Sequence, residues 1–349
     1  MHMSDALVSP AVAASMWATT AGASALSARA LRRRPDDRRV PLMGVLGAFV
    51  FAAQMVNFSI PGTGSSGHLC GGLLLTILLG PAAAFLVMVS VLTVQALFFA
   101  DGGLLALGCN VFNLGFLTSF VAYPLVFAPL ARTRPTRGRL ALATVLASVV
   151  GLQLGSLGVV LETVISRRTS LSLDAFLVLM QPIHLAIGVV EGLVTTAVVL
   201  FIRDARPDLV LAGSDAPVPP PSPRRFAAGV LLAAAVAAGV LSWFASSAPD
   251  GLEWSLARAS AGAKANAPPG ALHSLFAMIQ ERTAVLAREA RLRAGDPEGP
   301  DTARGRWPQV DATVSLSGLA GAALTLALAG LLAAGLRLVR RRSRPPSPQ

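Results

Sequence analysis

The chain has 349 residues, of which 54% are hydrophobic and 13% are charged, with a formal net charge of +11 at pH 7. This balance is typical of a membrane protein with many spans and excludes a soluble globular domain. The positive charge does not indicate nucleic-acid binding, because the arginines lie between apolar runs, where they orient membrane proteins. Cys70 and Cys109 lie in or beside apolar runs and do not form a metal-site spacing.

Apolar runs divide the chain into candidate membrane spans. Nine runs are expected to cross, at residues 10–31, 41–58, 69–80, 81–99, 104–130, 140–161, 173–202, 226–245 and 312–336. The run over 69–99 is divided at Gly80-Pro81 because proline interrupts helices, and its first half is short for a span. We therefore predict an all-α polytopic membrane protein, with a seven-helix bundle followed by a two-helix module.

Arginine clusters set the expected orientation of these spans. The loops at 32–39 and 131–139 and the tail after residue 336 are rich in arginine, as cytoplasmic segments are. Two cytoplasmic loops need an even number of spans between them, and the division at Gly80-Pro81 provides it. The amino terminus and the loop at 59–68 are then extracytoplasmic, and the carboxyl terminus is cytoplasmic.

A linker separates two modules. Residues 212–224 are dense in Pro, Ser and Asp, which is typical of a flexible or polyproline-like connector. We predict one membrane domain over 1–211 and a second module over 225–349, with a polar extracytoplasmic segment between its two spans. Apolar residues at helical spacing predict an amphipathic helix near 272–294. This helix is expected to rest on the membrane or the first module, or to pack on its own loop.

The glycine-rich stretch PGTGSSGHLCGG, residues 61–72, carries one histidine, His68. A second histidine, His2, follows Met1. The Met1 amine, the His2 amide nitrogen and the His2 imidazole can chelate one metal ion in fused rings, and His68 would complete a square. Square-planar nitrogen coordination is typical of Ni(II) or Cu(II). The alternative is a loop histidine that only caps a helix.

Three stretches resemble the CbiM/NikM family, the substrate-specific components of energy-coupling factor transporters for cobalt and nickel. They are MHMSDALVSP at the start, the segment VPLMGVLGAFVFAAQMVNFSIPGTGSSGHLCGGLLLTILLGP, and ADGGLLALGCNVFNLG. This resemblance covers roughly residues 1–203. The sequence PDGLE at 249–253 resembles an element of the family's small CbiN/NikN partner. The chain is thus similar to a natural fusion of the two components.

The resemblance implies a function and its partners. Met1, His2 and His68 would hold the transported Ni²⁺ or Co²⁺ as a bound ligand, with no further cofactor, to supply cobalamin synthesis or nickel enzymes. The fusion would lie in the lipid of the bacterial plasma membrane. It would work with a CbiQ/NikQ-like transmembrane coupling protein and with CbiO/NikO-like cytoplasmic ATPases. The chain lacks the P-loop signature, so we expect a transport subunit and not an enzyme.

Further polar residues near the site have competing interpretations. Asn57 is the best candidate to orient the His68 ring, although ordinary hydrogen bonding within the loop would explain it equally well. Asp5 is expected to cap the first helix, with a contact to the site as the alternative interpretation. His184 and Glu191 lie seven residues apart on one predicted helix and are expected to bind each other or a neighbouring helix.

One rival function belongs to a different class of protein. Gly64-Ser65-Ser66-Gly67 fits a short pattern of intramembrane serine proteases, with Ser66 as nucleophile. His184 on a later span would then act as the base. The Met1-His2 start would have no role in such an enzyme.

Overall fold

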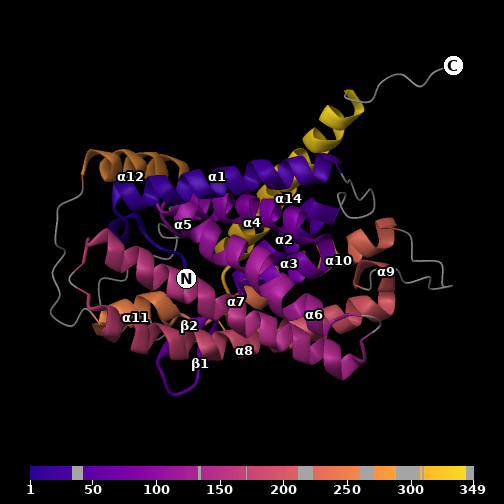
Figure 1. Cartoon of the computed structure of the whole chain (residues 1–349), viewed down its shortest axis with the longest axis horizontal. Coiled ribbons are helices and arrows are strands. Elements are labelled where there is room, and N and C mark those ends of the chain that lie inside the picture. The colour runs from indigo at the N-terminus through magenta and orange to yellow at the C-terminus, as the bar shows by residue number, and fades with distance from the viewer. Residues whose placement is uncertain are drawn as a thin grey trace.

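The computed structural model of the protein describes residues 1–33, 42–132, 135–169, 171–210, 223–259, 270–287, 307–308 and 310–342. Residues 212–222 of the linker predicted at 212–224, and residues 288–294 at the end of the predicted amphipathic helix, lie outside this set. The described chain is almost entirely helical, and its sheet has two short antiparallel strands (Figure 1). The prediction of an all-α membrane fold is confirmed, apart from this hairpin.

The first module contains twelve helical segments and the hairpin in chain order. They are η1 (Asp5–Leu7), α1 (Pro10–Arg33), α2 (Leu42–Gln54), β1 (Phe58–Ile60), β2 (Ser65–Gly67), α3 (Gly72–Leu79), α4 (Pro81–Val94), η2 (Gln95–Phe99), α5 (Leu107–Val111), η3 (Phe112–Phe127), α6 (Ala128–Leu130), α7 (Arg137–Ser166), α8 (Leu173–Ala205) and α9 (Pro207–Val210). The second module contributes α10 (Pro223–Gly239), η4 (Leu241–Phe244), α11 (Gly251–Ala259), α12 (Ala271–Thr283) and α14 (Ala312–Arg342).

Five helical stretches among the described residues are long and apolar enough to cross a membrane. They are Pro81–Phe99, Leu107–Leu130, Arg137–Ser166, Leu173–Ala205 and Ala312–Val339. Helix α2 is apolar but shorter, and α1 is diluted by alanine, serine and threonine. The total of nine spans therefore stays a prediction.

The break at Gly80-Pro81 is confirmed. Helix α3 ends at Leu79, Gly80 adopts a positive φ of 81°, and α4 begins at Pro81. With eight residues, α3 is roughly 12 Å long at about 1.5 Å per residue, too short to cross a membrane by itself. All eight of its residues are buried inside the protein, where a helix too short to cross a membrane is tolerated.

The second module packs directly on the first. Helices α10 and α14 lie against α2 (Figure 1). Gly44 and Gly321 permit this approach, because a Cβ at Gly44 would lie 2.8 Å from the Leu326 carbonyl oxygen, and one at Gly321 would overlap the Phe51 ring. Small residues at such crossings are typical of helices that pack within a membrane.

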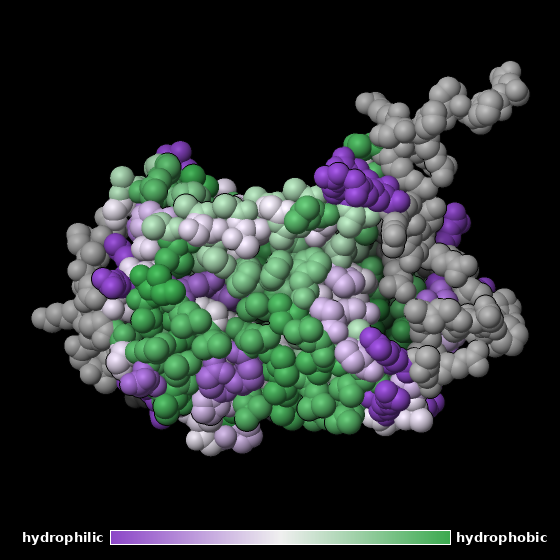
Figure 2. Space-filling model, viewed as in Figure 1, coloured by the Kyte–Doolittle hydropathy of each residue, from purple (hydrophilic) through white to green (hydrophobic). Residues whose placement is uncertain are grey.

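The outer surface agrees with a membrane setting. Figure 2 shows a face that is largely apolar, with many of the strongly hydrophilic residues toward the two ends of the long axis. Exposed large side chains such as Leu125, Val178 and Phe201 belong to the long helices η3 and α8. Lipid would remove this apolar surface from water.

Helix α12 confirms that the predicted amphipathic helix rests on the first module. His273 Nε2 donates to the Val8 carbonyl oxygen at 2.9 Å, and Gln280 Nε2 donates to the Gly102 carbonyl oxygen at 2.7 Å. In Figure 1, α12 lies beside α1 at the end of the molecule where α1 begins. The second module thereby covers the amino-terminal segment.

Candidate metal centre

The structure brings the amino terminus and the glycine-rich loop together. Met1 is 4% exposed, and the His2 ring stacks on the His68 ring with 5.1 Å between centroids and an angle of 18° between planes. The charge pattern predicted that these segments share one side of the membrane, and their contact agrees with that prediction.

A cradle at 101–110 holds the amino-terminal segment. Asn110 receives the Met3 N–H on Oδ1 at 2.7 Å and donates Nδ2 to the Met3 carbonyl oxygen at 3.1 Å. The Gly103 N–H donates to the same carbonyl oxygen at 2.8 Å. A Cβ at Gly103 would overlap the Asp5 carboxylate, so only glycine lets this segment lie so close. His2 is therefore fixed by its neighbour Met3.

The prediction that Asp5 caps the first helix is wrong. Its Oδ1 accepts the Ala106 N–H at 2.9 Å, which fastens the amino-terminal segment to the cradle. Ser9 stands before α1 instead, and its Oγ accepts the Val12 N–H at 3.3 Å. Asp5 and Ser9 are four residues apart, and both are residue types that cap helices. Their positions in the sequence therefore did not show which one caps α1.

His68 lies just beyond β2, in a loop that is anchored on both sides. Glu191 of α8 accepts the Cys70 N–H at 2.8 Å and the Gly71 N–H at 3.1 Å. Gln54 Nε2 donates to the Cys70 carbonyl oxygen at 2.7 Å. Glu191 thus binds a neighbouring segment, one of the two predicted outcomes, and it does not pair with His184 in the described structure.

Burial and one ion pair set the charges at this centre. The Met1 amine lies 3.0 Å from Asp250 Oδ2. Burial alone lowers the pKa of that amine, but Asp250, Cys70 and Asp101 together outweigh burial, with Asp250 contributing most, and the net shift is upward. Burial and the neighbouring ammonium lower the pKa of His2 to about 3 and that of His68 to about 4. Both imidazoles are therefore neutral at physiological pH, as metal ligands must be.

Each imidazole presents a nitrogen that is buried and has no hydrogen-bond partner, Nε2 of His2 and Nε2 of His68. His68 Nδ1 faces the Leu69 carbonyl oxygen at 3.2 Å, so this nitrogen carries the proton and Nε2 keeps its lone pair. A carbonyl oxygen behind the ring is the usual support of a metal-ligating histidine. His2 Nδ1 lies 3.3 Å from Asp101 Oδ1.

Within the described residues, no group of three or more His, Cys, Asp or Glu side chains gathers as a metal cluster. The candidate centre uses only two such side chains, His2 and His68, because its other two nitrogens are the Met1 amine and the His2 amide nitrogen. Asn57, the predicted orienting residue, makes no hydrogen bond to His68 among the contacts of the described chain. Its carbonyl oxygen accepts the Ser246 N–H at 2.8 Å instead.

Asp250 is the main residue that sequence reasoning missed. It begins α11 with a reciprocal cap, because its Oδ1 accepts the Glu253 N–H at 2.7 Å and Glu253 Oε2 accepts the Asp250 N–H at 3.3 Å. This leaves Oδ2 free to face Met1. The spacing D-x-x-E within PDGLE predicts that Asp250 caps a helix. It does not predict that the second carboxylate oxygen, Oδ2, pairs with the distant Met1 amine.

The segment around PDGLE extends the hairpin that precedes His68 (Figure 1). The Ser66 N–H donates to the Pro249 carbonyl oxygen at 2.8 Å, and Trp254 Nε1 donates to the Thr63 carbonyl oxygen at 2.8 Å. Gly251 is required beside α8, because a Cβ there would lie 2.6 Å from Ile183 Cγ2. The second module therefore forms one wall of the centre.

The geometry removes the basis of the protease alternative. Ser66 Oγ donates to the Ala248 carbonyl oxygen at 2.7 Å, and His184 Nδ1 donates to the Met180 carbonyl oxygen at 2.8 Å. No hydrogen bond joins Ser66 to His184 in the part of the chain that the structure describes. A serine nucleophile needs such a bond to its base.

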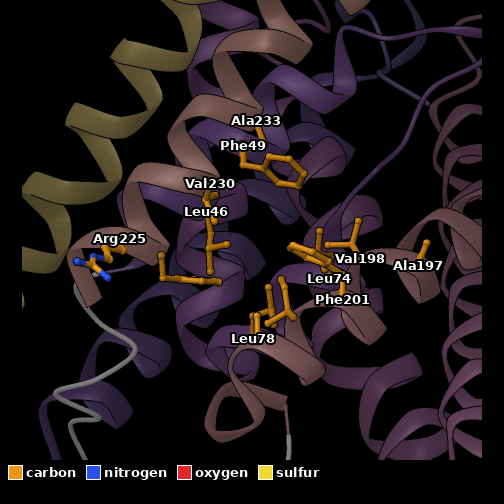
Figure 3. Close-up of a pocket in the computed structure, with 14 residues that line it drawn as sticks. Leu46, Phe49, Leu74, Leu78, Ala197, Val198, Phe201, Arg225, Val230 and Ala233 are labelled. Carbon is orange, nitrogen blue, oxygen red and sulfur yellow. The ribbon is translucent and has the colours of Figure 1, made fainter. Parts of the chain in front are cut away.

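A cavity of about 670 Å³ lies between α2, α3, α8 and α10, away from Met1, His2 and His68. Figure 3 shows Leu46, Leu74, Leu78 and Phe201 on its walls, with Arg225 to one side. Its lining is otherwise apolar and offers no metal ligand. We therefore place the candidate centre at Met1, His2 and His68 and not in the larger cavity.

Two family models match the chain in order. The model of the cobalt uptake substrate-specific transmembrane region, CbiM, matches residues 2–209, and that of the PDGLE domain matches residues 224–338. The first includes His2 and His68, and the second includes Asp250. His2 and His68 therefore lie in the part of the chain that matches CbiM, whereas Asp250 lies in the part that matches the PDGLE domain.

Relatives agree with these matches. The fused nickel transport protein NikMN of Rhodobacter capsulatus is 31% identical over 98% of this chain and 100% of its own length. The cobalt transport protein CbiM of Sorangium cellulosum is 35% identical over 53% of this chain and 84% of its own. A crystal structure of a truncated transition metal transporter superposes with a TM-score of 0.52 at 29% identity, over 58% of this chain and 99% of that one.

Proposed function

Because the chain belongs to the CbiM family of cobalt and nickel transport proteins and carries a fused PDGLE domain, we propose that Met1, His2 and His68 capture Ni²⁺ or Co²⁺ for import. The observation that carries this proposal is the meeting of a buried amine with two neutral, stacked imidazoles. His68 keeps an Nε2 without a hydrogen-bond partner, and His2 Nδ1, which would bind the metal, lies 3.3 Å from Asp101 Oδ1. The chain is a transport subunit and not an enzyme.

The ligand set would be four nitrogens: the Met1 amine, the His2 amide nitrogen, the His2 imidazole and the His68 imidazole. The His2 amide nitrogen and Nδ1 belong to one residue, so they close a chelate ring without any change of fold. The metal would replace Asp101 beside the His2 ring and Asp250 beside the Met1 amine. Since the amine and the amide must lose protons, binding would release protons.

We extend this proposal to the domain boundaries, the membrane orientation, the partners and the preferred metal. Residues 1–211 form the metal-capturing domain, 212–224 the linker and 225–349 the PDGLE module. The chain lies in the plasma membrane with the amino terminus outside and the carboxyl terminus in the cytoplasm. It works in an energy-coupling factor transporter with a CbiQ/NikQ-like coupling protein and CbiO/NikO-like ATPases. Nickel is favoured over cobalt, because the relative aligned over the whole chain is named a fused nickel transport protein.

Metal analysis of the purified full chain tests this function. We expect one Ni²⁺ or Co²⁺ per wild-type chain, and a loss of binding by about 10- to 100-fold or more in His2→Ala and His68→Ala. His273→Ala is a matched control, since His273 is also buried but lies on α12 and donates Nε2 to the Val8 carbonyl oxygen. Unchanged metal content in both His2 and His68 variants would overturn the proposal.

A further inference from the structure

A small cavity lies between the candidate metal ligands and the PDGLE module. Its volume is about 10 Å³, and its walls include Met1, His68, His184, Asp250 and Gly251. Such a volume admits about one water molecule or ion. Residues from the amino terminus, from α8 and from the second module therefore line one small cavity.

His184 presents a metal-binding nitrogen to this cavity. The residue is 1% exposed, and its Nδ1 donates to the Met180 carbonyl oxygen at 2.8 Å. A carbonyl oxygen only accepts, so the neutral ring carries its proton on Nδ1 and keeps a lone pair on Nε2. That Nε2 is buried and has no hydrogen-bond partner. This arrangement, with a carbonyl oxygen behind the ring, is the usual support of a histidine ligand.

Asp250 supplies the charge. Its Oδ1 is occupied by the cap of α11, whereas Oδ2 faces the cavity and the Met1 amine. Gly251, next to Asp250, packs against the His184 ring, because a Cβ there would lie 3.1 Å from His184 Cε1, and both His184 and Asp250 line the cavity. A carboxylate oxygen and an imidazole nitrogen on one cavity are suitable ligands for divalent transition metals.

We propose that His184 Nε2 and Asp250 Oδ2 form a second metal position, which receives the ion before Met1, His2 and His68 bind it. This proposal rests on the function proposed above. When the ion occupies this position, it replaces the Met1 amine as the partner of Asp250. The Met1 ammonium is then released beside the ion, which it binds after losing one proton to solvent, and the imidazole lone pair of His184 gains the partner that it lacks.

The proposal explains two features that the four-nitrogen site leaves unused. A buried imidazole nitrogen without a partner is unfavourable, and such groups in native proteins call for a specific reason. A carboxylate from the second module, held 249 residues away from Met1 in sequence, lies at the mouth of a site that the first module could build alone. In the proposed second position, the unpartnered His184 nitrogen and the Asp250 carboxylate would both be metal ligands.

Removal of the main ligands isolates the second position. In the full chain carrying His2→Ala and His68→Ala, we expect one Co²⁺ to bind weakly, measured by equilibrium dialysis and by the visible absorption of bound Co²⁺. Adding His184→Ala or Asp250→Asn should weaken this binding by about tenfold or more. Adding His273→Ala should leave it unchanged. If the doubly substituted chain binds no Co²⁺, or if neither added substitution weakens binding, the proposal is wrong.

The order of binding is tested in the chain with its main ligands intact. We expect His184→Ala to slow Ni²⁺ capture in rapid mixing by about tenfold, with a much smaller change in equilibrium affinity. An unchanged rate would contradict the proposed order. Thermal unfolding checks that the variant folds, and Asp250→Asn provides an independent substitution that keeps the side-chain shape. Failure of the main function would look different, because His2→Ala and His68→Ala would then leave metal content at the wild-type level.

Discussion

Gly103 decides how closely the amino-terminal segment approaches the metal centre. A Cβ at this residue would overlap the Asp5 carboxylate, which cannot move far because its Oδ1 accepts the Ala106 N–H. In Gly103→Ala we expect the segment around Met3 to be displaced and Ni²⁺ affinity to fall by about tenfold or more. Isothermal titration of the purified chain measures this.

Gly22→Ala is the matched control, since nothing lies within 4 Å of a Cβ there and the residue is within α1. Alanine favours a helix over glycine, so this variant should bind metal normally and be slightly more stable. If Gly103→Ala binds metal as well as Gly22→Ala, the cradle does not position His2.

The protonation states of the ligands predict a pH dependence. Burial and the Met1 ammonium lower the pKa of His2 to about 3 and of His68 to about 4, so neither ring takes up a proton above about pH 5. The Asp250 carboxylate raises the pKa of the Met1 amine despite its burial, so the amine is protonated at neutral pH. Metal affinity should therefore rise with pH from 6 to 8.

We expect that rise to be about ten- to hundredfold per pH unit, because the amine and the His2 amide each release one proton on binding. Competition titrations at several pH values measure the slope. A slope near zero over this range would show that the amine and the amide do not bind the metal.

At the scale of elements, Glu191 connects α8 to the start of α3. It accepts two buried N–H groups, those of Cys70 and Gly71, directly after His68. Glu191→Ala would leave both unpaired, at about 1–3 kcal/mol each. We expect a lower unfolding temperature together with weaker Ni²⁺ binding, measured by thermal unfolding and by titration.

Glu281→Ala serves as the comparison, because Glu281 lies exposed on α12. It should change neither quantity. If Glu191→Ala lowers the unfolding temperature but leaves Ni²⁺ affinity unchanged, Glu191 supports the fold without positioning the His68 loop.

Much of the arrangement of elements could be predicted from the sequence. Hydropathy located the long helices, the Gly80-Pro81 pair marked the break between α3 and α4, and arginine placement put Met1 and His68 on one side. These signals are local or statistical. The Gly103 cradle, the Asp250 ion pair and the cavity beside His184 depend on contacts between segments that are far apart in sequence, for example Met3 with Asn110. Periodicity carries no information on such contacts.

At the scale of the whole molecule, the two modules make direct contacts in addition to the linker that joins them in sequence. Helix α2 packs against both α10 and α14, and the hairpin binds the segment around Pro249. We expect a chain with a protease site inserted in the linker at 213–220 to stay associated after cleavage and to keep its Ni²⁺ affinity. Size-exclusion chromatography in detergent and metal titration of the cleaved protein test this.

A matched sample carrying Gly321→Val should separate more readily after cleavage, because the added side chain would overlap Phe51 where α14 crosses α2. Separation of the unsubstituted cleaved halves would show that the linker is needed to hold the modules together.

The ion pair between Met1 and Asp250 also has a consequence for biosynthesis. These residues are separated by 249 positions, so the first residue made must wait until most of the chain has been translated before its partner emerges. During that interval the Met1 ammonium lacks its counter-charge, and the small cavity lacks a wall. A nascent chain that stops before the second module should therefore have an unfinished, solvent-accessible centre. The position proposed between His184 and Asp250 would then form only after the second module has been made.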